Sequence, residues 1–259
     1  MRLFRWILSL TLVATVAIGV GVSSAQAATI LTNFGTGFGQ GVADTAGNIW
    51  NNMERLRTDG GADIADLSPP YPPLSSIADL VDSTGASTGI SLAVTDPLTN
   101  NSGSDEATLP GFNDPDDGLL YEHGATGAYH FGRQTTGNTL GIYTLSNLDP
   151  NTTYDLKILS ARGNNNAAYV EDFTIFHGGT DQMQSVPTGL NGVGGNYTLA
   201  KFVGLVPDGN NEIQIQIDGS EAFTYINFLR IDTPSVPEPT TLALAGLSVL
   251  LLGPARFRM

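Results

Sequence analysis

The amino-acid sequence predicts an all-β protein folded as a two-sheet β-sandwich. Apolar and polar residues alternate with a period of two in many short segments, most strictly in residues 212–218, where three isoleucines fall on one face. The chain contains 31 glycines and 14 prolines, which together with Asn, Asp and Ser supply turns between these segments. Amphipathic helical periodicity is nearly missing between the two ends of the chain. Short alternating segments separated by turns are typical of a sandwich.

The expected strands follow one another from the N-terminal to the C-terminal side of the body. They are residues 29–34, 88–95, 139–145, 153–160, 172–177, 198–203, 212–218 and 222–231. With shorter ones, about nine to eleven strands form two sheets that bury their apolar faces against each other. Residues 48–56 are ambiguous, because Trp50, Met53, Glu54 and Leu56 also suit one or two helical turns.

Composition limits the classes of function. The chain has no cysteine, so disulfides, thiolate metal sites and cysteine nucleophiles are excluded. Its formal net charge is −14, which repels nucleic acids and anionic membrane surfaces and favours solubility and divalent cations. We therefore expect no nucleic-acid partner.

The N-terminal end has the three parts of an export signal. Arg2 and Arg5 precede an apolar stretch at residues 6–22, and Ala25-Gln26-Ala27 offers small residues for cleavage. Residues 1–27 are predicted to form a helical signal peptide, with Ala28 as the first mature residue; an uncleaved anchor is the alternative. Residues 28–235 have the length of one domain.

The C-terminal end, residues 236–259, combines a short motif, an apolar run and a basic end. Pro237-Glu238-Pro239 precedes residues 242–252, which carry no charge, and Arg256 and Arg258 follow. The apolar stretch, at most about eighteen residues, is short for a transmembrane helix, which needs roughly 20. Under the positive-inside rule the two arginines stay in the cytoplasm as a membrane stop.

This arrangement resembles the PEP-CTERM sorting signal of exopolysaccharide-producing bacteria. The resemblance implies an exosortase-type protease that acts near the motif, transient membrane anchoring of the precursor, and a mature protein at the cell surface or outside the cell. The chain departs from the family in its short apolar run, interrupted by Gly253 and Pro254, and in having only two arginines.

Turn and strand signatures in the body match a known kind of module. Residues 145–156 form a strand, a polar turn and a second strand opened by Tyr154, and the series continues through residues 160–162 and 173–175, Asn191, Asn196 and residues 204–209. This series resembles the jelly-roll, galactose-binding-like domains of exported bacterial proteins, often found beside carbohydrate-active enzymes. A fibronectin-like module, which shares the turn at residues 148–154, is the alternative.

The densest group of carboxylates is a candidate calcium site. Asp114, Asp116 and Asp117 lie in a loop with Asn113 and Gly118, and Ca²⁺ prefers carboxylate and amide oxygens. The spacing does not match an EF-hand, and Asn-Asp-Pro and Asp-Asp-Gly are equally typical of turns. Calcium is the single cofactor that the sequence suggests.

Four residues are candidates for glycan binding. Trp50 and Asn51 combine an aromatic ring with an amide, Tyr71 lies in a stiff proline-rich loop, and Arg162 ends a strand. A tryptophan packed in the core is the alternative for Trp50, and a turn-stabilising role is the alternative for Arg162.

The sequence assigns no catalytic residue. A glycosidase needs two carboxylates about 5–10 Å apart, and Glu54, Glu122, Glu171 and Glu212 are candidates that sequence cannot pair. His123, His130 and His177 are too dispersed for a metal site, and the G-x-S-x-G elbow of a serine hydrolase is missing. We therefore expect a non-catalytic, exported, polysaccharide-associated binding module; a carbohydrate-active enzyme or a purely structural surface protein is the alternative.

Overall fold

The computed structural model describes residues 28–35, 41–53, 76–96, 100–104, 109–133, 140–163, 167–219 and 223–233. The predicted signal peptide and the predicted sorting region lie outside these residues. In the described part of the chain, no helix is long and apolar enough to cross a membrane.

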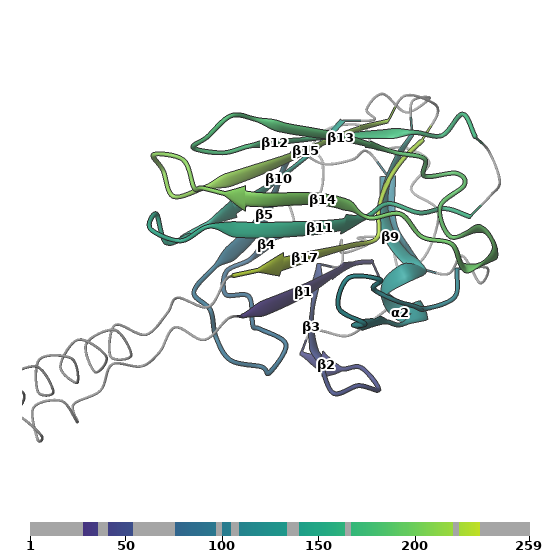
Figure 1. The fold of residues 1–259 in the computed structure, drawn as a ribbon, viewed down its shortest axis with the longest axis horizontal. Coiled ribbons are helices and arrows are strands. Elements are labelled where there is room, and N and C mark those ends of the chain that lie inside the picture. The colour runs from purple at the N-terminus through teal and green to yellow at the C-terminus, as the bar shows by residue number, and fades with distance from the viewer. Residues whose placement is uncertain are drawn as a thin grey trace, which may run out of the picture. The chain divides into compact units, whose positions relative to one another are not determined.

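Two six-stranded sheets make up most of the body (Figure 1). Sheet A contains β1 (Thr29–Phe34), β2 (Val42–Ala43), β3 (Ile49–Met53), β11 (Tyr154–Leu159), β14 (Ala200–Leu205) and β17 (Phe228–Asp232), in the order β14-β11-β17-β1-β3-β2. Sheet B contains β4 (Ser76–Ile77), β5 (Ser91–Asp96), β10 (Leu140–Ser146), β12 (Glu171–Phe176), β13 (Gln182–Val186) and β15 (Ile213–Gly219), in the order β13-β12-β15-β10-β5-β4. The predicted all-β sandwich is confirmed.

Smaller elements surround the two sheets. A three-stranded sheet is formed by β16 (Phe223–Ile226), β9 (Ala128–Arg133) and β6 (Asn100–Ser104), and β7 (Phe112–Asn113) pairs with β8 (Leu120–Tyr121). The described helices are one turn of α-helix, α2 (His123–Thr126), and a 3-10 turn, η2 (Val193–Gly195). Pairing within the large sheets is antiparallel except for β1 with β3, which run parallel.

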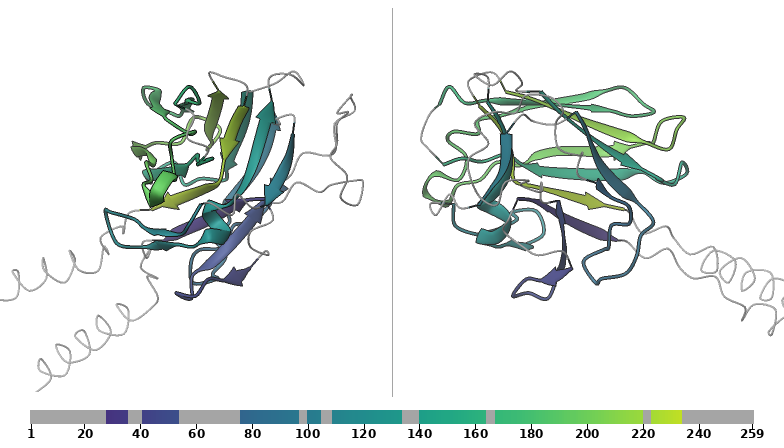
Figure 2. Two further views of the ribbon diagram at one scale, coloured as in Figure 1. Left: turned by 90° about the vertical axis from the view of Figure 1, so that its right-hand side faces the viewer. Right: turned by 180° about the vertical axis from the view of Figure 1, so that it is seen from behind.

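The main hydrophobic core lies between sheets A and B. Figure 2 shows the two sheets from two further sides. Ile213, Ile215 and Ile217 of β15 are fully buried there, as the period-two pattern predicts. Sheet A contributes Leu229 and Ile231 of β17. Burying apolar side chains stabilises the fold by roughly 1.5–3 kcal/mol each, so this core holds the two layers together.

A second hydrophobic cluster covers the outer face of sheet A. Sheet residues Leu31, Trp50, Leu159 and Phe228 pack there against the segments around residues 109–125 and 197–199. Because both faces of sheet A are covered here, residues 228–231 of β17 are all buried. Alternation of exposed and buried residues is therefore lost in this strand, although the backbone is extended.

The structure resolves two points that the sequence left ambiguous or predicted differently. Residues 49–53 form strand β3 rather than helical turns, because Trp50 and Met53 pack into clusters on opposite sides of sheet A. The predicted strand at residues 222–231 is two strands in different sheets, β16 and β17. They are separated at Asn227, whose side chain accepts a hydrogen bond from Ala161 N (2.7 Å) and donates one to Thr126 O (2.6 Å).

Candidate functional site

The acidic segment between β7 and β8 is a tight turn held by its own side chains. Asp114 Oδ1 accepts a hydrogen bond from Asp116 N (2.9 Å), and Asp117 Oδ1 accepts one from Leu119 N (3.0 Å). Gly118 has a φ of 75°, a conformation that glycine adopts without steric cost. The Asn-Asp-Pro-Asp-Asp-Gly sequence therefore forms the turn that its residue types favour.

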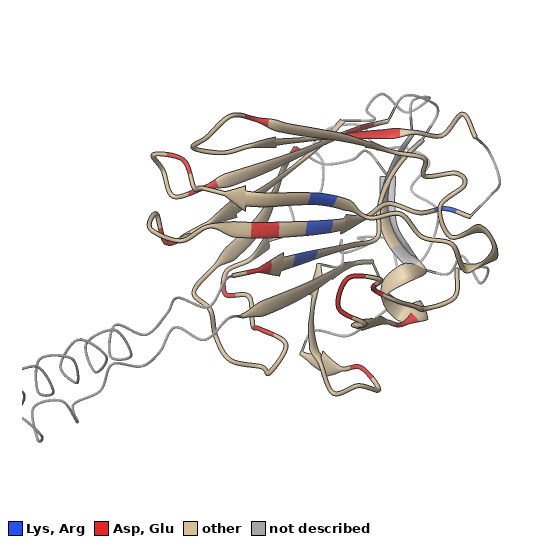
Figure 3. Ribbon diagram, in the orientation of Figure 1, with Lys and Arg blue, Asp and Glu red and all other residues tan. Residues whose placement is uncertain are grey.

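Three cationic residues of sheet A face this turn. Lys201 on β14, Lys157 on β11 and Arg230 on β17 are paired in register across three neighbouring strands. Neighbouring strands lie about 4.8 Å apart, so the three side chains form one row on the outer face of the sheet. Figure 3 shows the blue segments side by side on the three strands.

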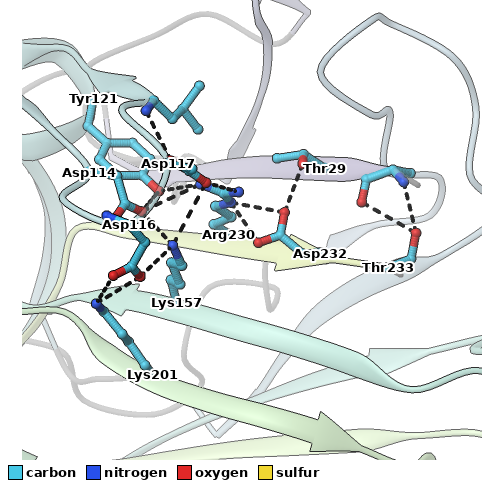
Figure 4. Close-up of polar contacts among 12 residues, drawn as sticks. Thr29, Asp114, Asp116, Asp117, Tyr121, Lys157, Lys201, Arg230, Asp232 and Thr233 are labelled. Atoms are coloured by element: carbon cyan, nitrogen blue, oxygen red, sulfur yellow. Dashed lines mark hydrogen bonds and ion pairs between the residues drawn. The ribbon is translucent and has the colours of Figure 1, made fainter. Parts of the chain in front are cut away.

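The acidic turn and the basic row form a continuous ion-pair network, which Figure 4 shows in detail. Lys157 Nζ lies 2.7 Å from Asp114 Oδ2 and 2.9 Å from Asp116 Oδ2. Lys201 Nζ lies 2.8 Å from Asp116 Oδ2, and Arg230 Nη2 lies 2.6 Å from Asp117 Oδ2. Each aspartate of the turn therefore has at least one cationic partner.

Burial makes Asp114 the centre of this network. Its side chain has no exposed surface, and its Oδ2 also accepts a hydrogen bond from the Tyr121 hydroxyl (3.1 Å). Asp116 is exposed, and hydrogen bonds from Lys201 and Lys157 lower its pKa to about 2. Burial acts to raise the pKa of Asp117, but hydrogen bonds led by that from Arg230 outweigh it and lower the pKa. The turn therefore stays anionic at neutral pH.

The residues of the predicted calcium site form this ion-pair network in the structure. Within the described ranges, no group of three or more His, Asp or Glu side chains has the arrangement of a metal site. A Ca²⁺ ion needs six to eight oxygens, whereas the oxygens of Asp114, Asp116 and Asp117 face Lys157, Lys201 and Arg230. The turn interpretation of the acidic segment is the one that this geometry supports.

Trp50 and Asn51 are buried structural residues rather than glycan contacts. Trp50 has no exposed surface; its indole Nε1 donates to Asp44 Oδ2 (3.0 Å), and its ring packs edge-on against Phe228. Asn51 is fully buried, donates to Leu31 O (3.0 Å) and Val81 O (2.8 Å), and accepts from Val81 N (2.9 Å). The alternative of a tryptophan packed in the core holds for Trp50.

Arg162 lies in a different environment from Trp50. Its guanidinium carbon is 5.1 Å from the centre of the Tyr225 ring, and its backbone N donates to Thr188 O (3.0 Å). The proposed glycan contact Tyr71 lies outside the described residues. The structure thus gives no shared site for Trp50, Asn51 and Arg162.

Two of the candidate catalytic glutamates, Glu171 and Glu212, are separated. Glu122 accepts from Thr45 N (2.7 Å), and Glu212 accepts from Ser146 Oγ (3.0 Å). Glu171 pairs with Gly219 at one end of β15, whereas Glu212 precedes the other end. The length of that strand separates them by about 20 Å, which is beyond the reach of a glycosidase carboxylate pair. Glu54 lies outside the described residues.

The three histidines are also placed apart from one another, each with a local partner. A ring nitrogen of His123 lies 2.7 Å from Leu109 O, one of His130 lies 3.2 Å from the Tyr143 hydroxyl, and one of His177 lies 2.8 Å from Thr180 O. Each of the three therefore has a structural contact of its own.

Glu171 is a buried carboxyl group held in a polar pocket of hydroxyls. It accepts hydrogen bonds from the hydroxyls of Ser160 and Thr188, the latter at 2.8 Å, and from Tyr225 N at 2.7 Å. Burial raises the pKa of this carboxyl well above 4.5, although the hydrogen bond from Thr188 acts to lower it. The folded protein therefore holds Glu171 in its neutral form at pH values where an exposed glutamate is already ionised.

Sequence reasoning did not single out the outer face of sheet B, which is the best candidate for ligand contact. Because Ile213, Ile215 and Ile217 point into the core, Gln214 and Gln216 point outward. Thr174 and Phe176 of β12 lie beside them. Both hydrophobic clusters of the described residues lie elsewhere, between the sheets and outside sheet A. The Gln-x-Gln alternation was the sequence signal for this face.

Comparisons with known proteins add nothing to the fold or the site. No family model matches the chain, and no curated protein matches it. One solved structure, that of TmCBM61 in complex with β-1,4-galactotriose, aligns with a TM-score of 0.25 and 9% sequence identity. The alignment covers 51% of this chain and 86% of that one. The β-sandwich assignment therefore rests on the sheets of this chain and not on that likeness.

We expect the substitution Asp114→Ala to lower the free energy of unfolding by about 3 kcal/mol. It removes the buried acceptor of Lys157 and Tyr121 and leaves the mostly buried Lys157 with only the more exposed carboxylates of the turn as partners. Asp116→Ala, at the exposed end of the same turn, is the matched control and should cost much less. Urea unfolding midpoints of the two variants measure this; equal losses would contradict the central role of Asp114.

We expect Glu171→Gln to remove part of the pH dependence of stability. The unfolded carboxyl releases its proton near pH 4.5, whereas the folded one keeps it, so folding stability falls as the pH rises above that value. Glutamine imitates the neutral acid, and the variant should be more stable than the wild type at pH 8 and similar to it at pH 4.

The control for this comparison is Glu212→Gln, on the partly exposed glutamate that precedes β15. Melting temperatures of the wild type, Glu171→Gln and Glu212→Gln, measured from pH 4 to pH 8, test this prediction. Parallel curves for the wild type and Glu171→Gln would show that Glu171 is not held neutral.

Proposed function

We propose that this protein is an exported, non-catalytic module that binds polysaccharide at the cell surface or in the extracellular matrix. The observation that supports binding most directly is the outer face of sheet B, where Gln214, Gln216 and Thr174 present amides and a hydroxyl. Such groups donate and accept hydrogen bonds, as the hydroxyls of sugars require. The same face is broad enough for a polymer, since it spans the strands of a six-stranded sheet.

The arrangement of the acidic residues favours binding over catalysis. Asp114, Asp116 and Asp117 are held by cations, Glu171 is buried and neutral, and Glu212 lies about 20 Å from it along β15. General acid–base hydrolysis of a glycoside needs two accessible carboxyls across a single bond. None of these described carboxylates meets that requirement with another.

The two ends of the chain support the proposed location. Residues 1–27 have the pattern of a cleavable signal, and residues 236–259 have the motif, apolar run and arginines of a PEP-CTERM signal. In this proposal an exosortase-type protease releases the body after the apolar run has anchored the precursor in the membrane. We expect the motif to be accessible to such a protease, because proline at positions 237 and 239 cannot continue a helix or a central strand.

For sorting, we expect the extracellular form in the native host to lack the residues after about Pro239. Replacing Pro237, Glu238 and Pro239 with alanine should leave the protein in the membrane fraction with its tail intact. Mass spectrometry of the secreted form and of the membrane fraction tests this. A secreted form that yields peptides containing Arg256 would show that the tail is not removed.

For binding, we expect the purified protein to be retained by at least one polysaccharide in affinity electrophoresis and to release no reducing ends from it. The panel should contain neutral polymers and polygalacturonate as the anionic member. A steady increase in reducing ends would favour the carbohydrate-active enzyme. Retention by no member of the panel would favour a purely structural surface protein.

A further inference from the structure

Two uncharged rows of side chains cross the outer face of sheet B at right angles to its strands. Register pairs Thr174 with Gln216 and Gln216 with Ile142, which gives the first row across β12, β15 and β10. It pairs Phe176 with Gln214 and Gln214 with Thr144, which gives the second row across the same strands. Each row therefore combines amide or hydroxyl groups with one apolar side chain.

Three of the four polar side chains in these rows are available to a ligand, whereas the fourth, Thr144, is buried. In the part of the chain that the structure describes, the amides of Gln214 and Gln216 and the hydroxyl of Thr174 make no hydrogen bond. All three residues are partly exposed. Met183 of β13, which pairs with Thr174, extends the first row by one strand, and 74% of its surface is exposed.

Charged residues border the rows, and Asp96 of β5 pairs with Ile142 at one end of the first row. Asp172 and Asp218 are paired across β12 and β15 on one side, and Glu212 precedes β15 on the other. With a net charge of −14, the chain and these flanking carboxylates repel an anionic polymer. A neutral polymer rich in hydroxyls meets no such repulsion and finds donors and acceptors in the rows.

The spacing of the rows fits an extended polymer. Neighbouring strands are about 4.8 Å apart, which is close to the length of one pyranose residue in an extended chain. A polysaccharide that crosses the strands at right angles then places successive sugars over successive strands. The apolar face of a sugar ring can lie against Ile142 or Phe176 while its hydroxyls reach the glutamines.

From these observations we infer that the outer face of sheet B binds an extended neutral polysaccharide that lies across β13, β12, β15 and β10. This inference rests on the proposed function and adds to it the site, the chemical class of the polymer and its direction relative to the strands. Gln214 and Gln216 are the central contacts, because β15 lies between β12 and β10.

The first experiment measures affinity against ligand length. Neutral oligosaccharides of one to six residues, from cellulose, mannan, xylan and β-1,4-galactan, are titrated by calorimetry into the exported protein. Binding across four strands predicts an affinity that rises with each added residue up to about four and then levels off, since strands are one sugar apart. An affinity that is complete with a single residue would overturn the extended arrangement.

The second experiment tests the site with a double substitution and a matched control. Gln214→Ala with Gln216→Ala should lower the affinity roughly tenfold or more, since it removes two or more hydrogen bonds. Asn196→Ala with Thr198→Ala, in an exposed segment next to the cluster outside sheet A, should leave affinity unchanged. Melting temperatures of both variants confirm that they are folded.

The outcomes separate this inference from the proposed function. If the wild type binds a neutral polymer and the glutamine variant binds it equally well, the site is wrong and the function stands. If the wild type binds polygalacturonate alone, the polymer class is wrong. If it binds no polysaccharide, the function and the inference both fail.

Discussion

The buried ion pair between Asp114 and Lys157 is the interaction on which the packing outside sheet A depends. Asp114 has no exposed surface, so its charge is tolerated because Lys157, at 2.7 Å, and the Tyr121 hydroxyl satisfy it. Through these contacts the turn between β7 and β8 is held against the outer face of sheet A. Tyr121 and Phe228 then stack at 4.4 Å, and Trp50 closes the same cluster from β3. The ion pair of Asp114 with Lys157 thus positions the stacked rings of Tyr121 and Phe228.

This coverage makes the two sheets chemically different. Sheet A is packed on both faces where the acidic turn and the outer hydrophobic cluster lie. Its lysine and arginine side chains form ion pairs with the carboxylates of the turn. Sheet B buries one face in the shared core and presents amides, hydroxyls and a few apolar groups on the other. The proposed ligand surface is a consequence of this asymmetry.

Strand positions could be predicted where one face meets the core and the other meets water. Residues 212–218 are the clearest case, since Ile213, Ile215 and Ile217 alternate with polar residues and the structure has β15 there. Prediction was weaker where both faces are packed, as at residues 228–231, and where strands are short, as in β7 and β8. The residues of the candidate ligand-binding site were harder still to predict from the sequence. Trp50 and Asn51 have the residue types of a glycan site, yet exposure decides whether such residues can meet a ligand, and both are buried.

By itself, the sequence determined the fold class and the acidic turn, because periodicity and turn chemistry are local properties. The export signals at its two ends stay predictions from short linear motifs. Only the tertiary structure decided the partners of those residues. Asp114 and Lys157 are 43 positions apart, and Glu171 receives a hydrogen bond from Tyr225, 54 positions away. Whether a carboxylate binds a metal, holds a lysine or stays neutral depends on which groups the fold brings within about 4 Å of it, and no local pattern specifies that set.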